Sequence, residues 1–294
     1  MRRLPWQPSL VHVHLLAPDA LPLLRYCARR GIPVVVTEHA TYLPELLGDA
    51  RAKAQIRKVL EGADAVVAVG SWLASVITGL RPDTPLHVIG NVIDTDFFSP
   101  PATPLRRHAV MVAPTLDERK GIDVLLEAWR LIADSVGLPL VLVGEDPDGL
   151  AARLVARLGL ADRVELHGPL GREDLRETLR NAAVYVCASR SETFGVAVAE
   201  ALACGVPVVC TRCGGPESFV TEAVGVVVPN EDAVALAGAV LKLVDAAPRF
   251  AVGALHRHVA EQFGPDAFSA RMLHLYEDVL ARRAGGIPVR STYD

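Results

Sequence analysis

The sequence predicts an α/β protein with doubly wound parallel sheets. Short, continuous runs of Val, Ile and Leu recur along the chain, and each is followed by a longer stretch with the helical period. Such runs are typical of strands that are covered by helices on both faces. The length of 294 residues favours two domains of ordinary size, and a hydrophobic content of 51% excludes a disordered chain.

Four of the apolar runs lie in the first third of the chain, and they predict strands near 10–14, 33–37, 64–69 and 85–89. The stretch FFSPPATPLRR follows at residues 97–107, where prolines and the absence of a period indicate a linker. We therefore expect a first domain over residues 1–100. With four strands it is an incomplete member of its class.

A second group of runs predicts a complete doubly wound domain over residues 101–265. Its six strands are expected near 108–113, 139–143, 162–166, 183–187, 206–210 and 224–228. A last helical pattern from Asp266 to Arg282 makes residues 266–294 a C-terminal helix and tail.

Composition and charge exclude several function classes. A net charge of −4 and a pI near 6.1 give no reason to expect nucleic acid as a partner. Five scattered cysteines indicate a reducing, cytoplasmic location, and the lone Cys210-x-x-Cys213 pair lacks the further ligands of a zinc site, so we expect no metal. No signal peptide is apparent, and no apolar run reaches a membrane-spanning length, so any membrane contact is expected to be peripheral.

Glu200 stands out in the stretch SETFGVAVAEALACGVPVV. From Phe194 to Ala203 every other residue is apolar or glycine, so a helix here is buried and its carboxylate needs hydrogen-bond donors. One source of donors is the diol of a ribose lying against the helix. The alternative is an internal partner, an Arg or backbone N–H groups.

Glu192 precedes the same helix, and Phe194 and Gly195 open its first turn. Unpaired N–H groups and the positive end of the helix dipole favour an anion such as a phosphate there. The alternative for Glu192 is a purely structural role in capping the helix.

Two further turns follow predicted strands at the sheet edge where doubly wound folds bind ligands. The turn TLDERKG carries Arg119 and Lys120, which could neutralise a diphosphate, although taken alone such a run is more typical of a solvated loop. Gly144 and Glu145 end the strand LVLVG and form a weaker signal of the same kind.

His39 follows the predicted strand VVVTE in the first domain and could contact a substrate or move a proton. A structural histidine is the alternative. His12 and His14 alternate along another strand, and without a Cys or carboxylate partner they are poor candidates for metal ligands.

Taken together, these motifs resemble the retaining glycosyltransferases of family four, also called group one glycosyl transferases. The hallmark of that family is a pair of glutamates separated by seven residues, here Glu192 and Glu200. The similarity covers nearly the whole chain through SETFGVAVAEALACGVPVVCTRCGGPE, RKGIDVLLEAW, LVLVGE, VELHGPLGREDL, VGVVVPNEDAVALAGAVLKLV, VVVTEHATYL, ADAVVAVGSWLASVI and HVIGNVIDTDFFSP.

The resemblance implies two facing Rossmann-like domains of the GT-B type, which move a sugar from a nucleoside-diphosphate sugar to a saccharide, lipid or small-molecule acceptor with retention of configuration. It implies no metal and no cofactor. Glu192 would lie by the donor sugar, Glu200 by the ribose and Lys120 by the diphosphate. Phe194 and Gly195 would offer backbone N–H groups, and His39 would lie near acceptor and sugar.

Two departures from the family pattern stand out. The usual Gly-Arg-Leu after the strand that precedes the lysine is replaced by Val112–Leu116, so Arg119 would have to supply the second cation from a different backbone position. No counterpart of the family's opening strand and glycine-rich loop precedes Leu10, which predicts an N-terminally short member.

These departures leave two rivals to an active transferase. One is a non-catalytic or truncated protein that binds the nucleotide sugar without a complete acceptor domain. The other is a two-domain epimerase of sugar nucleotides, which the glutamate pair and the RKG motif favour less.

Overall fold

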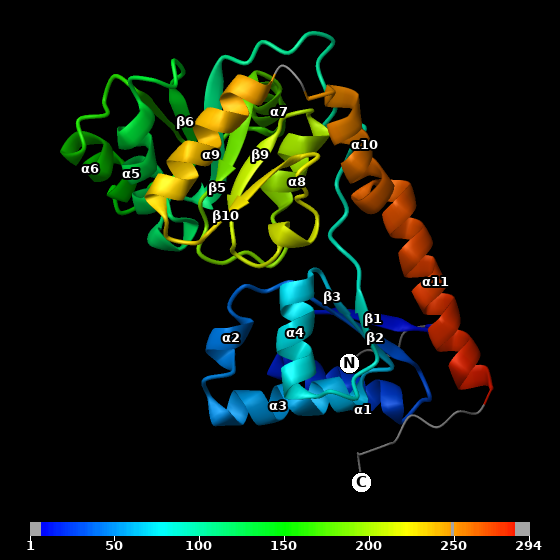
Figure 1. The fold of residues 1–294 in the computed structure, drawn as a ribbon. Coiled ribbons are helices and arrows are strands. Elements are labelled where there is room, and N and C mark those ends of the chain that lie inside the picture. The colour runs from blue at the N-terminus through cyan, green and yellow to red at the C-terminus, as the bar shows by residue number, and fades with distance from the viewer. Residues whose placement is uncertain (1–6, 248–249, 286–294) are drawn as a thin grey trace. The chain divides into compact units, whose positions relative to one another are not determined.

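The computed structural model describes residues 7–247 and 250–285 of the chain (Figure 1). Contacts divide the protein into two units: residues Met1–Asn91 with Phe268–Asp294 form the first, and Val92–Ala267 form the second. Each unit is built around its own parallel sheet.

The sheet of the first unit has the strand order β1-β2-β3-β4, with every neighbouring pair parallel. Its strands are β1 (Val11–His14), β2 (Val34–Glu38), β3 (Ala65–Ala68) and β4 (Leu86–Val88). All residues of β2 and β3 are buried, as expected of central parallel strands. The connecting helices are η1 (Pro18–Ala20), α1 (Leu21–Ala28), α2 (Leu43–Leu46), α3 (Ala50–Gly62) and α4 (Ser71–Leu80).

The long C-terminal helix α11 (Pro265–Ala284) completes the core of this unit. Its apolar side chains pack with those of β2 and β3 in one cluster made of Val35, Ala65, Val67, Ile89, Met272, Leu275 and Val279. Arg283 near its end donates to the buried carboxylate of Asp64 at 2.7 Å. Through this packing the described residues from 268 to 285 belong to the first unit, whereas the sequence suggested a separate C-terminal part.

The sheet of the second unit has the order β10-β9-β8-β5-β6-β7. Its strands are β5 (His108–Thr115), β6 (Leu140–Glu145), β7 (Val164–His167), β8 (Ala182–Cys187), β9 (Val208–Thr211) and β10 (Gly225–Val228). Read from β7, the order is that of a complete doubly wound domain, in which the winding reverses between β5 and β8.

Helices cover this second sheet and bury a large core around Trp129, to which α5, α6 and α9 contribute (Figure 1). The helices are η2 (Glu118–Lys120), α5 (Ile122–Ile132), α6 (Leu150–Arg157), α7 (Arg172–Arg180), α8 (Val196–Ala203), η3 (Pro216–Ser218), α9 (Ala233–Ala246) and α10 (Val252–Phe263). The ten strands of the described ranges lie within two residues of the apolar runs that predict them, and the α/β class is confirmed.

The segment after Asn91 belongs to the second unit, several residues before the proline-rich stretch that suggested the boundary. Ile93 N–H donates to the carbonyl of Phe263 at 2.8 Å, and the Phe98 side chain is buried. The guanidinium of Arg172 lies 4.2 Å from the ring centre of Phe97. These contacts hold the start of the linker on the second unit.

Candidate functional site

The strand order brings two of the predicted motifs to one place in the second unit. Because β5 and β8 are neighbours at the point where the winding reverses, the loops that follow them meet at the carboxyl edge of the sheet. Ligands of doubly wound folds bind at this point. The loop after β5 carries Lys120, and the loop after β8 carries Glu192.

Lys120 and Glu192 form a close ion pair at this edge. The Nζ atom of Lys120 donates to Oε1 of Glu192 at 2.6 Å, and both side chains are largely buried. The hydroxyl of Ser189 donates to the same oxygen at 2.8 Å. Sequence reasoning missed Ser189, whose only signal was a polar residue just after an apolar strand.

Local backbone structure fixes Lys120 at the end of β5. The Asp117 side chain accepts from Lys120 N–H at 2.9 Å. The next residue, Gly121, has φ of 67°, and a Cβ there would lie 2.0 Å from the carbonyl oxygen of Ala188. Only glycine allows the TLDERKG loop to approach the end of β8 so closely.

The backbone of Glu192 is held by the loop that follows β9. Its N–H donates to the carbonyl of Cys213 at 2.8 Å, and its carbonyl accepts from Gly215 N–H at 2.8 Å. Gly215 has no room for a side chain, because a Cβ would lie 2.4 Å from the Phe194 nitrogen. The loop that carries Glu192 and the loop that carries Gly214 and Gly215 are therefore packed directly against each other.

Phe194 and Gly195 lead into α8, which begins at Val196. The Phe194 ring is buried against the rings of Phe219 and Phe263, with ring centres 5.3 and 4.9 Å away. Gly195 has φ of 91° and serves as the N-cap; no side chain in the described ranges caps the helix. The first N–H groups of α8 are therefore available to an anion.

Glu200 lies on the open face of α8, together with Val196, whereas most other residues of the helix are buried. The side chain of Glu200 is half-buried rather than enclosed on all sides, which differs from the sequence expectation. Burial raises the pKa of its carboxyl group to about 7, and the charge of Arg172 opposes this shift. Within the described part of the chain, no hydrogen bond or ion pair satisfies this carboxylate.

The two arginines near the pair differ in their surroundings. Arg119 is half-exposed and lies 3.8 Å from the Asp117 carboxylate, so it stays close to the edge of the site. Arg190 binds both oxygens of Asp123 at 2.9 and 2.8 Å and also contacts Glu231. Arg190 therefore ties the loop after β8 to α5, a structural role that the sequence did not reveal.

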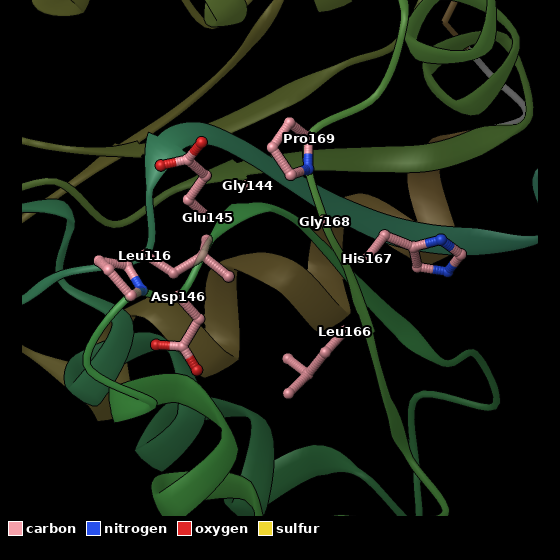
Figure 2. A pocket seen from close by; sticks show the side chains of 9 residues that line it. Leu116, Gly144, Glu145, Asp146, Leu166, His167, Gly168 and Pro169 are labelled. Carbon is pink, nitrogen blue, oxygen red and sulfur yellow. The ribbon is translucent and has the colours of Figure 1, made fainter.

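A cleft of about 370 Å³ opens at the carboxyl ends of β5, β6 and β7, and neither Lys120 nor Glu192 belongs to its wall. Figure 2 shows Leu116, Glu145 and Asp146 on one side of it and Leu166 and His167 on the other. Its wall consists of Leu116, Gly144, Glu145, Asp146, Pro147, Leu166, His167, Gly168 and Pro169. Gly144 and Glu145, predicted from the end of LVLVG, therefore line a real cavity.

In the first unit, His39 lies directly after β2. Its Nδ1 is 3.1 Å from Oδ1 of Asn91, and its Nε2 is 2.9 Å from Nδ1 of His14. Burial lowers the pKa of His39, although the hydrogen bond to Asn91 opposes this. His39 is thus part of a hydrogen-bonded cluster at the carboxyl edge of the first sheet.

The described residues contain no group of three or more His, Cys, Asp and Glu side chains arranged to hold a metal ion. All five cysteines are buried and unpaired in disulfides. None of the helices formed by residues 7–247 and 250–285 combines the length and the hydrophobicity that crossing a membrane requires.

Comparison with protein families gives two matches. The model described as glycosyl transferases group 1 matches residues 106–246, and the model described as glycosyltransferase family 4 matches residues 1–97. Together they cover most of the chain.

Among curated proteins, the D-inositol 3-phosphate glycosyltransferase of Xylanimonas cellulosilytica is 34% identical over 67% of this chain. The match spans about half of that relative, 52% of its length. The N-acetyl-alpha-D-glucosaminyl L-malate synthase of Bacillus anthracis is 28% identical, with 92% of this chain and 75% of the relative covered.

Among solved structures, sucrose-phosphate synthase from Thermosynechococcus elongatus has a TM-score of 0.78 and 25% identity over 93% of this chain and 74% of its own. Anabaena HepE in complex with UDP has a TM-score of 0.77 and 19% identity, with 91% of this chain and 78% of that chain covered. The second likeness concerns the fold alone.

Proposed function

We propose that this chain, which belongs to the group 1 glycosyltransferases of family 4, transfers a sugar from a nucleoside-diphosphate sugar to an acceptor hydroxyl with retention of configuration. The acceptor is a saccharide, a lipid or a small molecule. With a lipid acceptor the protein would contact the membrane peripherally.

The observation that carries this proposal is the carboxylate of Glu200, which lacks a partner among the described residues. It lies on the open face of α8, about one turn from the uncapped start of that helix. A nucleoside diphosphate carries a partner for each of these two groups. Its ribose hydroxyls can donate to the Glu200 carboxylate, and its phosphates can accept from the first N–H groups of α8.

Lys120 supplies the charge that the reaction needs. When the bond between the sugar and the diphosphate breaks, negative charge develops on the departing oxygen, and a fixed cation nearby stabilises it. The Nζ atom of Lys120 is held by Glu192 and its backbone by Asp117, so the cation is in place before the ligand arrives.

The cleft at the carboxyl ends of β5, β6 and β7 would accommodate the nucleoside. Its volume of about 370 Å³ is within the range of small-ligand sites, and apolar Leu116 and Leu166 lie beside polar Glu145. Asp146 is already engaged, because its carboxylate accepts from Ala151 and Ala152 N–H at the start of α6. Glu145 is an exposed polar side chain of the wall that a ligand could contact.

Binding and turnover experiments test the proposal against its rivals. Calorimetry with UDP-glucose, UDP-N-acetylglucosamine and GDP-mannose is expected to show binding of at least one. Transfer is then followed with D-inositol 3-phosphate, L-malate and octyl glucoside as acceptor probes. If the protein binds a nucleotide sugar but neither transfers nor hydrolyses it, the result would favour a non-catalytic nucleotide-sugar-binding protein. An epimerised product would favour an epimerase of sugar nucleotides. Absence of any binding would contradict the proposal.

A further inference from the structure

Three of the five cysteines gather at the carboxyl ends of β8 and β9 in the second unit. Cys187 is the last residue of β8, and it lies opposite Cys210 of β9 in the register of these two parallel strands. Cys213 follows two residues after the end of β9, in the loop that binds the backbone of Glu192. The sequence showed only the Cys210-x-x-Cys213 spacing, and the fold brings Cys187 to it.

Hydrogen bonds between the loops after β8 and β9 bring Cys187 and Cys213 together. The hydroxyl of Thr211 donates to the carbonyl of Ser189 at 2.6 Å and to that of Cys187 at 3.4 Å. The N–H of Cys213 turns back to the carbonyl of Thr211 at 2.8 Å. The thiol of Cys213 donates a hydrogen bond to the sulfur of Cys187. The two sulfur atoms are therefore direct neighbours, as two thiols must be before they can form a disulfide.

The hydrogen bond between them makes these two thiols chemically unequal. It lowers the pKa of Cys187, which also accepts from the N–H of Ser189, although burial opposes the shift. The same hydrogen bond raises the pKa of Cys213, and burial adds to that shift. The thiolate is the reactive form of cysteine. Cys187 is therefore the nucleophile of the pair, and Cys213 is the thiol that can react with its oxidised form.

Solvent exposure distinguishes the same two cysteines from the others. Cys213 is 5% exposed and Cys187 is 3% exposed, whereas Cys27 and Cys210 are both 0% exposed. Because a thiol must meet its oxidant before it reacts, a water-sized oxidant such as hydrogen peroxide reaches this pair more readily than it reaches Cys27 or Cys210.

We infer that Cys187 and Cys213 form a site of reversible oxidation by a peroxide, and that the disulfide between them displaces Glu192 from Lys120. The Cys187 thiolate attacks one oxygen of hydrogen peroxide, the O–O bond breaks, and a sulfenic acid and a hydroxide ion form. The hydroxide takes up the proton that Cys187 released and becomes water. The Cys213 sulfur then attacks the Cys187 sulfur, the S–O bond breaks, and the hydroxyl leaves with the Cys213 proton as a second water. Two thiols and one peroxide thus give one disulfide and two waters.

The disulfide would act on the site through the backbone of Cys213. The carbonyl of Cys213 accepts from the N–H of Glu192 at 2.8 Å, and the next residue, Gly214, pairs with Glu192 as an isolated parallel bridge. A disulfide draws its sulfur atoms to about 2 Å from each other, closer than two hydrogen-bonded sulfur atoms lie, so the backbone at Cys213 has to move. A misplacement of about 1 Å at a reacting group costs about 100-fold in rate. This effect rests on the proposed function, whereas the thiol pair rests only on the geometry of the second unit.

Mass spectrometry of peptides under non-reducing conditions tests the thiol pair without any substrate. The full chain is treated with hydrogen peroxide, the remaining thiols are blocked with N-ethylmaleimide in denaturant, and the protein is digested. Linked peptides that contain Cys187 and Cys213 are expected, and dithiothreitol should separate them. Cys210 and Cys27 should carry the maleimide. A disulfide between Cys210 and Cys213, or no disulfide before irreversible oxidation begins, would overturn the inference.

A substitution at the attacking thiol tests the effect of the disulfide on the site. With the nucleotide sugar that binds, peroxide treatment of the wild type is expected to lower the rate of transfer or donor hydrolysis by about 100-fold, and dithiothreitol should restore it. Cys187→Ser lacks the attacking sulfur and should keep its rate after the same treatment. Cys27→Ser, at a buried cysteine of the first unit, is the matched control and should lose and recover activity like the wild type.

The outcomes separate failure of this inference from failure of the proposed function. Equal loss of activity in the wild type and in Cys187→Ser would show that peroxide acts elsewhere, and it would overturn the inference. A Cys187–Cys213 disulfide that leaves the rate unchanged would overturn the coupling to Glu192. A wild-type protein that binds no nucleotide sugar would instead overturn the proposed function, and the peptide analysis would still decide whether the thiol pair is oxidised.

Discussion

Lys120 Nζ and Glu192 Oε1 lie 2.6 Å apart although the two residues are separated by 72 positions in the chain. The loops after two neighbouring strands bring them together at the point where the sheet reverses its winding. Both side chains are largely removed from solvent, so each charge depends on the other until a ligand enters.

Lys120→Ala is expected to lower kcat by about 100- to 1,000-fold, the usual effect of removing one group that stabilises developing negative charge. Steady-state kinetics with the nucleotide sugar that binds most tightly measure this, and circular dichroism checks the fold. Lys242→Ala, at an exposed lysine of α9, is the control. Equal kcat values for Lys120→Ala and Lys242→Ala would show that Lys120 takes no part in the reaction.

Gly121→Ala is expected to weaken both stability and donor binding, because the new Cβ would lie 2.0 Å from the carbonyl oxygen of Ala188. Gly137 has the same φ of 67° with nothing within 4 Å of its Cβ position, so Gly137→Ala isolates the backbone strain. Urea unfolding should show that Gly121→Ala costs about 1–3 kcal/mol more than Gly137→Ala. A difference near zero would show that the close approach does not matter.

The carboxyl group of Glu200 should make stability depend on pH. Since burial raises its pKa from 4.5 to about 7, the folded state holds a proton in this window that the unfolded state has lost. The free energy of unfolding therefore falls as pH rises from about 4.5 to 7, by at most about 3 kcal/mol from this group.

Urea unfolding of wild type and Glu200→Gln at pH 5 and pH 8 checks this prediction. The substitution is expected to stabilise the protein at pH 8 relative to wild type and to have a much smaller effect at pH 5. Glu222→Gln, at an exposed position, should change neither value. A Glu200→Gln effect that is the same at both pH values would contradict the raised pKa.

The sequence predicts the strands well because parallel strands covered on both faces are mostly apolar, as in the VVV that opens β2 and the LVLV that opens β6. It also places Lys120 and Glu192 after strand ends and Gly144 at a strand end, at the sheet edge where doubly wound folds bind ligands. Local pattern is sufficient for this, because every parallel strand delivers its following loop to the same edge.

Contacts between distant segments are beyond such reasoning. The pairing of Lys120 with Glu192 depends on which strands are neighbours, and the bond between His14 and His39 depends on the register of β1 against β2. The packing of Met272 and Leu275 against the first sheet could not be predicted for the same reason. A helical period shows that a helix has an apolar face, but it does not show which element covers that face. The partial burial of the Glu200 side chain likewise depends on which elements pack around α8, and the sequence pattern does not show this.

Calorimetry on wild type and Glu200→Gln at pH 8 tests most directly whether Glu200 and the start of α8 hold a nucleotide sugar. We expect Glu200→Gln to weaken binding of the preferred UDP or GDP sugar by about tenfold or more, as for a lost hydrogen bond to a charged group. Binding of inorganic pyrophosphate, which lacks a ribose, should be unchanged. Equal affinity of both proteins for the nucleotide sugar would contradict the account.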